Sequence, residues 1–209
     1  GFYASIDYGD LPDTYGTTVA NKGAGHVLGG LRLGTSVVAS PDGNPTAAAD
    51  GDDAIDDNGI TFGSESWVQG NTVTLNANVS GANGYLVGWF DWNGDDKFGD
   101  GEMEIFGDMV NGSNPLSLKV PTDATNADPY IYMRFRLYDK NTMTAFSPTG
   151  LATNGEVEDY QHSWAPTAVT LFRFEAIAQG EAVRIVWETA SELDNLGFNL
   201  YRAATPAGS

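Results

Sequence analysis

Residues 72–80 read TVTLNANVS and residues 130–138 read YIYMRFRLY, and these two stretches decide the fold class. In each of them every second residue is apolar. These residues are Val73, Leu75, Ala77 and Val79 in the first stretch, and Ile131, Met133, Phe135 and Leu137 in the second. A period of two residues places such side chains on one face of an extended chain. The sequence therefore predicts two long β-strands, each with an apolar face.

The rest of the chain repeats this texture in shorter pieces. Its 26 glycines and 9 prolines fall mainly between apolar runs, as turn residues do. No segment shows a helical repeat with capping residues. The composition predicts an all-β protein, an antiparallel β-sandwich of the jelly-roll or immunoglobulin-like kind. Further strands are expected at residues 26–33, 60–68, 85–92, 115–120 and 156–164.

The pattern changes after Trp164, which predicts a first domain over residues 1–164 and a second module over residues 165–209. Residues 168–179 and 181–189 are expected to form a hairpin around Gly180, followed by a third strand from Gly197. Three strands with apolar residues on both faces do not bury themselves. We therefore expect an incomplete module that docks on the first domain, on a partner chain or on further residues of a longer chain. The start at Gly1 indicates a processed or excised form without a signal peptide.

The charge of the chain is strongly negative. Its 28 acidic and 10 basic residues give a formal net charge of −18. Such a chain repels phosphate backbones and anionic membranes, so nucleic acid and membrane insertion are not expected. No stretch approaches the roughly 18 apolar residues of a membrane-spanning helix. Because the chain has no cysteine, disulfides, thiolate metal sites and a cysteine nucleophile are excluded. Divalent cations are the favoured partners, since they relieve repulsion among the acids.

The sharpest acidic cluster lies at residues 91–102, DWNGDDKFGDGE. Oxygen-bearing side chains fall at positions one, three, five and twelve of this stretch, namely Asp91, Asn93, Asp95 and Glu102. With the backbone carbonyl of Lys97 at position seven, this is the ligand spacing of an EF-hand-type calcium loop. Two features depart from that motif: Asp96 occupies the glycine position, and the flanks are strands. The alternative is a solvated hairpin tip without a metal ion.

A second acidic cluster at residues 50–59 has looser spacing. Its candidate ligands are Asp52, Asp53 and Asp56. Calcium binding and an acidic turn that binds no metal are equally compatible with this stretch.

Several motifs together carry a family resemblance. Residues 155–160 read GEVEDY, residues 7–16 read DYGDLPDTYG, residues 90–95 read FDWNGD and residues 134–137 read RFRL. With shorter matches at residues 25–27, 31–34, 49–53 and 57–62, they cover about residues 5–164. This combination resembles the GEVED domain of large bacterial secreted and surface proteins. Residues 187–202 resemble the opening strands of a fibronectin-type-III-like module.

The resemblance implies an extracellular β-sandwich with a scaffold or adhesive role and no known catalysis. From the residues themselves, we expect Glu156, Glu158 and Asp159 to be able to close the Asp91 site from a neighbouring strand. The alternative is that the two glutamates pair with Arg134 and Arg136.

Catalysis is not expected. Neither histidine, His26 nor His162, lies in a metal-binding spacing, and no nucleophile elbow or phosphate-binding glycine loop occurs. Carboxylates in turns rich in glycine and asparagine favour metal ligation over acid catalysis, which needs an apolar setting. His26 is expected to be a hydrogen-bonded structural residue.

The sequence thus predicts a calcium-stabilised structural or adhesive module on the bacterial surface or secreted from the cell. One alternative is a self-assembling filament or surface-layer subunit that exchanges strands through its carboxy-terminal module. A weaker alternative is carbohydrate binding through exposed tryptophans, for which Trp92 is the best candidate.

Overall fold

The computed structural model describes residues 5–51, 57–126, 128–164, 169–180 and 182–192, together with Phe198 and Leu200. The chain divides into two compact units, Gly1–Ala165 and Pro166–Ser209. Strands make up 46% of the residues and helices 3%. The predicted all-β sandwich is confirmed. Within the described residues, no helix is both long and apolar enough to cross a membrane.

The first sheet of the larger unit is built around β5 (Thr72–Ser80). On one edge β5 pairs with β8 (Gly112–Lys119). Along the other edge lie β3 (Arg32–Leu33) and β4 (Ile60–Phe62). All of these pairings are antiparallel. Proline is tolerated at position 115 of β8 because, in the described chain, β8 pairs only with β5 and is an edge strand.

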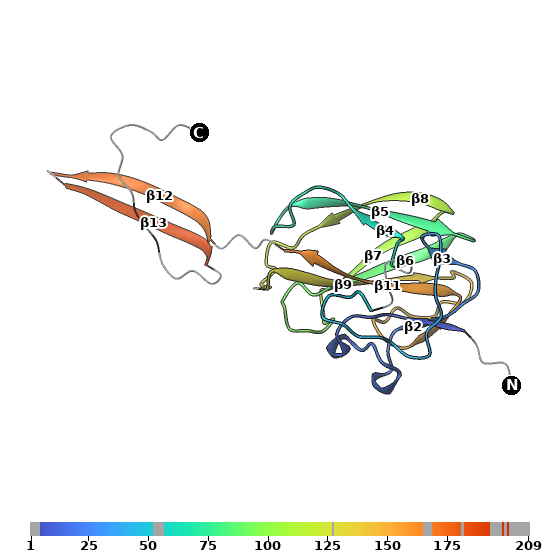
Figure 1. Ribbon diagram of the computed structural model, residues 1–209. Helices are drawn as coiled ribbons and strands as arrows, with labels where there is room; N and C mark the ends of the chain where they lie inside the picture. Colours follow the sequence, from blue (N-terminus) through green and yellow to red (C-terminus); the bar gives the residue numbers. More distant parts are fainter. Residues whose placement is uncertain are drawn as a thin grey trace. The chain divides into compact units, whose positions relative to one another are not determined.

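The second sheet has the order β11-β9-β6-β7 and is also antiparallel. Its strands are β11 (Gly155–Ser163), β9 (Tyr130–Tyr138), β6 (Gly84–Phe90) and β7 (Met103–Met109). In Figure 1 this sheet lies beneath β5, β4 and β8, so the two sheets form the layers of a sandwich.

The main core fills the space between these sheets. The alternating apolar residues of β5 and β9 are each at most 3% exposed, which confirms the predicted faces of both strands. Except for Ala77, whose side chain is a single methyl group, each such side chain contributes about 1.5–3 kcal/mol to folding by leaving water. One end of the core is aromatic: Trp92 stacks on Phe90 at 5.2 Å and on Trp67 at 6.2 Å between ring centroids. Trp164 packs 6.2 Å from Trp92.

A third layer covers the outer face of the second sheet. It contains β1 (Ile6–Tyr8), β2 (Gly25–Val27) and β10 (Leu151–Thr153), with two 3-10 turns, η1 (Asp13–Tyr15) and η2 (Val19–Asn21). In Figure 1, β2 lies on the side of β9 and β11 that faces away from β5. Because of this layer β9 is buried on both faces, and Arg134 and Arg136 are at most 1% exposed.

Two of the predicted strands differ from the observed ones. Residues 26–33 do not form one strand, because the chain turns at Gly30, where φ is +99°. The two ends of that range belong to β2 and β3, which lie in different sheets. The strand predicted at 60–68 is limited to β4, residues 60–62.

The smaller unit contains a hairpin of β12 (Val169–Gln179) and β13 (Ala182–Glu192). Its turn includes Gly180 in the left-handed region, with φ +60°. The hairpin predicted from the sequence is confirmed. The third strand expected from Gly197 lies largely outside the described residues.

Candidate metal centre

Three carboxylates converge in the loop that joins β6 to β7. One oxygen each of Asp91, Asp95 and Glu102 lies within 4.8 Å of the others. Asp91 and Glu102 are 1% and 4% exposed, whereas Asp95 faces solvent. A hard divalent cation prefers such a set of oxygen donors. Among the described residues this is the only group of three or more potential ligands found so close together.

The carboxylate of Asp91 organises the first turn of the loop. Its Oδ1 accepts hydrogen bonds from the backbone N–H groups of Gly94, at 2.7 Å, and Asp95, at 3.3 Å. Its Oδ2 accepts one from the N–H of Asp96 at 3.1 Å. These bonds wrap the backbone around the first candidate ligand, as a short acidic side chain does in a turn.

The next two candidate ligands repeat the pattern. Asn93 Oδ1 accepts from the N–H of Asp95 at 2.8 Å, and Asp95 Oδ1 accepts from the N–H of Lys97 at 3.1 Å. Asn93 and Lys97 are exposed. The loop thus turns around the side chains at positions one, three and five, as the sequence spacing predicts.

At position six the loop has Asp96, where an EF-hand-type loop usually has glycine. Asp96 has φ +60°, in the left-handed region that glycine adopts most readily. Aspartate tolerates this conformation better than most residues because its short side chain can bond locally. The substitution therefore does not prevent the sharp turn that this position needs.

Glu102 closes the loop from position twelve. Its Oε1 accepts from the N–H of Trp92 at 3.0 Å and its Oε2 from the N–H of Gly99 at 2.6 Å. Burial raises the pKa of Glu102, and the nearby charges of Asp91 and Asp95 raise it further, against the opposing effect of the backbone hydrogen bonds. A bound cation would counter this repulsion.

Tyr15 is a further member of the site that sequence reasoning missed. Its hydroxyl donates a hydrogen bond of 2.5 Å to Asp91 Oδ2, and Tyr15 is 3% exposed. Burial and the bond to Asp91 raise the pKa of Tyr15, so it stays a donor. Tyr15 lies 76 residues before Asp91. No spacing rule connects the two residues, so only the fold reveals the contact.

One residue that the sequence predicts to bind a ligand, Trp92, does not lie at the surface. Trp92 was expected to be exposed and to bind a ligand, but it is 6% exposed and belongs to the aromatic core. The reason is its place directly after β6, where its ring enters the space between the sheets. The candidate ligands Asp52, Asp53 and Asp56 lie outside the described residues.

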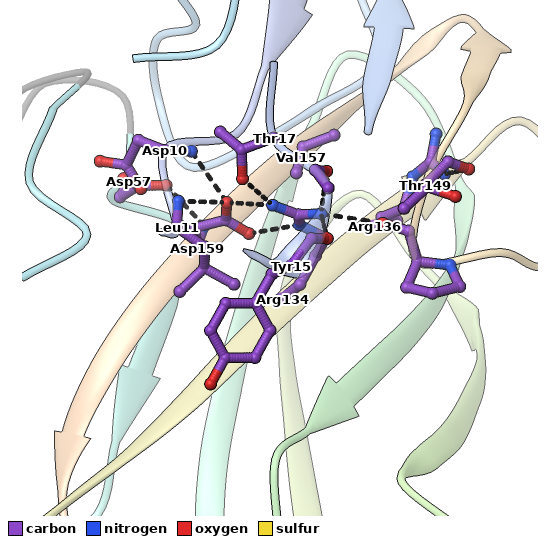
Figure 2. Close-up of polar contacts among 12 residues, drawn as sticks. Asp10, Leu11, Tyr15, Thr17, Asp57, Arg134, Arg136, Thr149, Val157 and Asp159 are labelled. Atoms are coloured by element: carbon purple, nitrogen blue, oxygen red, sulfur yellow. Dashed lines mark hydrogen bonds and ion pairs between the residues drawn. The ribbon is translucent and has the colours of Figure 1, made fainter. Parts of the chain in front are cut away.

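A buried acid, Asp159, faces Arg134 on the outer face of β9. Asp159 forms a bidentate ion pair with this guanidinium, with distances of 2.8 Å to both Nε and Nη2, and both residues are fully buried. Asp159 Oδ2 also accepts from the backbone N–H groups of Asp10, at 2.8 Å, and Leu11, at 3.0 Å. Figure 2 shows Asp159 between Arg134 and these two amides. One carboxylate thus fixes the N-terminal segment to β11.

The remaining N–H groups of Arg134 donate hydrogen bonds to the segments that cover this face of the sheet. Nη1 donates to the carbonyls of Tyr15, Gly16 and Pro148 at 2.9–3.1 Å, and Nη2 donates to the Thr17 hydroxyl at 3.0 Å. A buried charge is tolerable only when it is paired and fully hydrogen-bonded. Arg134 meets this condition.

Residues 85–163 match the GEVED domain. The matched range contains the Asp91 loop, β9 with its two arginines, and the GEVEDY motif at residues 155–160. The N-terminal segment that supplies Tyr15 and the Asp10 amide lies before this range. No curated protein shows a significant match to the chain.

The glutamates of the GEVED motif cap backbone groups. Glu158 Oε1 accepts from the N–H groups of Asn58 and Gly59 at 2.9 and 2.6 Å, and its Oε2 accepts from the Tyr160 hydroxyl at 3.0 Å. Glu156 accepts from the N–H of Leu33. Both glutamates are fully buried. They therefore hold the segments around β3 and β4 against β11.

The register of β11 explains why these glutamates do not join the Asp91 loop. Glu156 and Glu158 lie opposite Leu137 and Phe135 of β9, hence on the core face of the sheet. Asp91 contacts Tyr15, which belongs to the layer on the other face. For the same reason the alternative pairing with Arg134 and Arg136 is wrong: the acid opposite Arg134 is Asp159.

Arg136 has different partners from its neighbour. It donates to the carbonyls of Gly25, Ser147, Thr149 and Gly150 and, from Nε, to His26 Nε2 at 3.2 Å. His26 is fully buried. Burial, followed by the charge of Arg136, holds the pKa of His26 well below its usual value. The structural role expected for this histidine agrees with these contacts.

At two positions, Gly155 and Gly9, neighbouring atoms lie so close that only glycine fits. A Cβ at Gly155, the first residue of the GEVED motif, would lie 1.9 Å from the Leu137 carbonyl and 2.5 Å from His26 Nδ1. A Cβ at Gly9 would lie 2.2 Å from Asp159 Oδ2. Gly155 of β11 can lie this close to Leu137 and His26, and Gly9 of the N-terminal segment this close to Asp159, only because neither glycine has a side chain.

Proposed function

We propose that this chain is a calcium-stabilised, non-catalytic module with a structural or adhesive role in a secreted or cell-surface bacterial protein. The observation that carries this proposal is the convergence of Asp91, Asp95 and Glu102 in a loop with EF-hand-type spacing. The Asn93 amide and the Lys97 carbonyl are the further ligands that the spacing predicts. Bound Ca²⁺ would offset the excess of negative charge in this loop, whose single basic residue is Lys97.

The chemistry of the donors favours calcium over other cations. Within this set every proposed ligand atom is oxygen, the atom that Ca²⁺ and Mg²⁺ prefer. Mg²⁺ keeps several waters and demands strict octahedral geometry, whereas Ca²⁺ accepts six to eight ligands in a flexible arrangement. A twelve-residue loop in which three of the ligand residues, Asn93, Asp95 and Lys97, are exposed suits the flexible arrangement better.

Calcium would stabilise the fold by simple linkage. A ligand that binds only the folded state raises its stability, by about 2.7 kcal/mol at a concentration 100 times Kd. The chain has no cysteine and hence no disulfide to perform this role. A surface protein in millimolar calcium would remain rigid through such sites, which is the property a scaffold or adhesive module requires.

Thermal unfolding with calcium and with a chelator tests this proposal. We expect calcium to raise the unfolding midpoint of the wild type, and Asp91→Asn to abolish the rise. The matched control is Asp108→Asn, because Asp108 lies at the end of β7 with its side chain 67% exposed in a surface pair with Lys140. The control should keep the full rise. An unchanged wild-type midpoint would contradict the proposal.

Self-association is a second candidate function, and the hairpin of the smaller unit favours it. The register sets Phe174 opposite Trp187 and places apolar residues along the same face. Phe172, Phe174 and Val183 are 74%, 56% and 63% exposed. An isolated two-stranded hairpin is at best marginally stable, so such a face and its edges favour packing against further strands.

Sedimentation at millimolar calcium tests this second candidate. We expect wild-type chains to associate, and Phe174→Ser to weaken the association. Glu175→Gln, which alters a neighbouring residue in an exposed pair with Arg173, is the control and should leave association unchanged. A strictly monomeric wild type would contradict this candidate. The carbohydrate alternative loses its best candidate residue, because Trp92 is buried.

A further inference from the structure

We infer that Tyr15 joins the cation site and the N-terminal segment, residues 5–28, into one cooperative unit, so that a bound cation fastens this segment to the sandwich. Tyr15 acts here as a positioning residue. The inference rests on the proposed calcium function and concerns how that site is supported and what it controls.

The first step is the orientation of Asp91 by Tyr15. The phenol donates to Asp91 Oδ2 at 2.5 Å, while the N–H groups of Gly94 and Asp95 donate to Oδ1. The Tyr15 ring lies 4.9 Å from that of Phe98 and 5.4 Å from that of Tyr132. The hydroxyl is thus held in place by packing. A partner of this kind fixes the direction of a ligand's carboxylate before the cation arrives.

The second step is the anchoring of Tyr15 to the sheet. Its carbonyl accepts from Arg134 Nη1 at 3.1 Å, and that guanidinium is held in turn by Asp159. Asp159 also binds the amides of Asp10 and Leu11. Tyr15 therefore connects two networks: its side chain reaches the Asp91 loop, and its backbone belongs to the clamp around Arg134.

The third step is thermodynamic. If the N-terminal segment helps to orient a ligand of the cation, then it raises the affinity for the cation. Linkage requires the reverse as well: the cation must stabilise the docked segment by the same factor. Loss of a partner that orients a metal ligand typically lowers metal affinity about 10–100-fold. Removal of the Tyr15 hydroxyl should have an effect of that order.

The test compares wild type with Tyr15→Phe, which keeps the ring packing and removes only the hydroxyl. Calcium affinity is measured by calorimetry, and hydrogen exchange of residues 5–28 is measured with calcium and with a chelator. We expect Tyr15→Phe to bind calcium about tenfold more weakly or worse. We also expect calcium to slow exchange in residues 5–28 of the wild type, and much less in the variant at the same calcium concentration.

Tyr132→Phe is the matched control. Its ring also packs against Tyr15, but its hydroxyl donates to the carbonyl of Ala47 at 2.8 Å. This variant should bind calcium as the wild type does. If wild type binds no calcium, the proposed function fails. If wild type binds calcium and Tyr15→Phe binds it equally well, the inference alone is overturned.

The wild-type exchange experiment is decisive even if Tyr15→Phe does not fold. Calcium that protects the Asp91 loop but leaves residues 5–28 unchanged would overturn the inference and leave the calcium function intact.

Discussion

The larger unit contains two sets of acidic residues that look alike in the sequence but differ in their surroundings. In the GEVED motif, Glu156, Glu158 and Asp159 accept hydrogen bonds from backbone groups of distant segments, and Asp159 also pairs with Arg134. In the Asp91 loop, three carboxylates converge on one another, and their hydrogen bonds come mainly from the loop itself.

The difference shows that the role of an acid is set by the donors around it. A carboxylate that meets an arginine and several N–H groups is stabilised as an anion by the protein. In the Asp91 loop, burial raises the pKa of Glu102, and the charges of the converging Asp91 and Asp95 raise it further against the opposing backbone hydrogen bonds. The first set therefore ties distant segments to β11, and the second is the set that a cation would stabilise under the proposed function.

Among the variants proposed here, Asp159→Asn should cause the largest loss of folding stability. It leaves the Arg134 charge buried without its counter-ion and weakens the attachment of the Asp10 and Leu11 amides. Breaking a buried pair from one side costs about 3–5 kcal/mol. Urea unfolding in chelator measures the loss. Asp108→Asn, in an exposed pair with Lys140, should change stability by about 0–1 kcal/mol. Equal effects of the two variants would refute the assignment.

A second prediction separates the two sets by their response to calcium. Glu102→Gln should lose the calcium-induced stabilisation, which amounts to about 2.7 kcal/mol at 100 times Kd. Asp159→Asn, although less stable, should keep a calcium effect, reduced only through its indirect connection to Asp91 by way of Arg134 and Tyr15. The measurement is urea unfolding at fixed temperature, with and without calcium. A calcium effect that vanishes in Asp159→Asn would mean that the two sets are not separable.

The third prediction concerns the steric requirement of the GEVED motif. Gly155→Ala should destabilise the fold by about 1–3 kcal/mol, because the new Cβ would lie 1.9 Å from the Leu137 carbonyl and the strands would have to shift. Gly99→Ala in chelator is the control, since its Cβ would meet no described atom closer than Glu102 Oε2 at 3.6 Å. Similar unfolding midpoints for the two variants would argue against a close-approach role for Gly155.

The smallest predicted effect is a pH dependence that comes from His26. Its pKa is held low in the folded state, so between that pKa and about 6.5 only the unfolded chain binds the proton. Stability should therefore be complete above pH 6.5 and fall below it, by up to about 1.4 kcal/mol per pH unit. His26→Gln should flatten this slope between pH 6.5 and 5.5 in urea titrations. His162 is present in both chains, so its contribution cancels. A slope that is the same in both proteins would contradict the prediction.

The alternation of apolar residues predicted strands correctly where one face of the strand packs on the core. It predicted β5 and β9 to the residue, and the hairpin of the smaller unit closely, because alternation and turn glycines are local properties. It failed at residues 26–33, where Gly30 redirects the chain to a different sheet. It also gave no sign of β1, β7 or β10, whose short or exposed sequences carry little alternation.

The all-β class and the spacing of the acids in the Asp91 loop could both be predicted from the sequence, because both depend on neighbours within about a dozen residues. Which acids face each other depends on how the strands and layers pack. The register of β11 on β9 turned Glu156 and Glu158 toward the core and Asp159 toward Arg134. The third layer brought Tyr15 to Asp91 and buried both arginines. These contacts join residues 25–149 positions apart, and such distances are set by packing and not by sequence spacing.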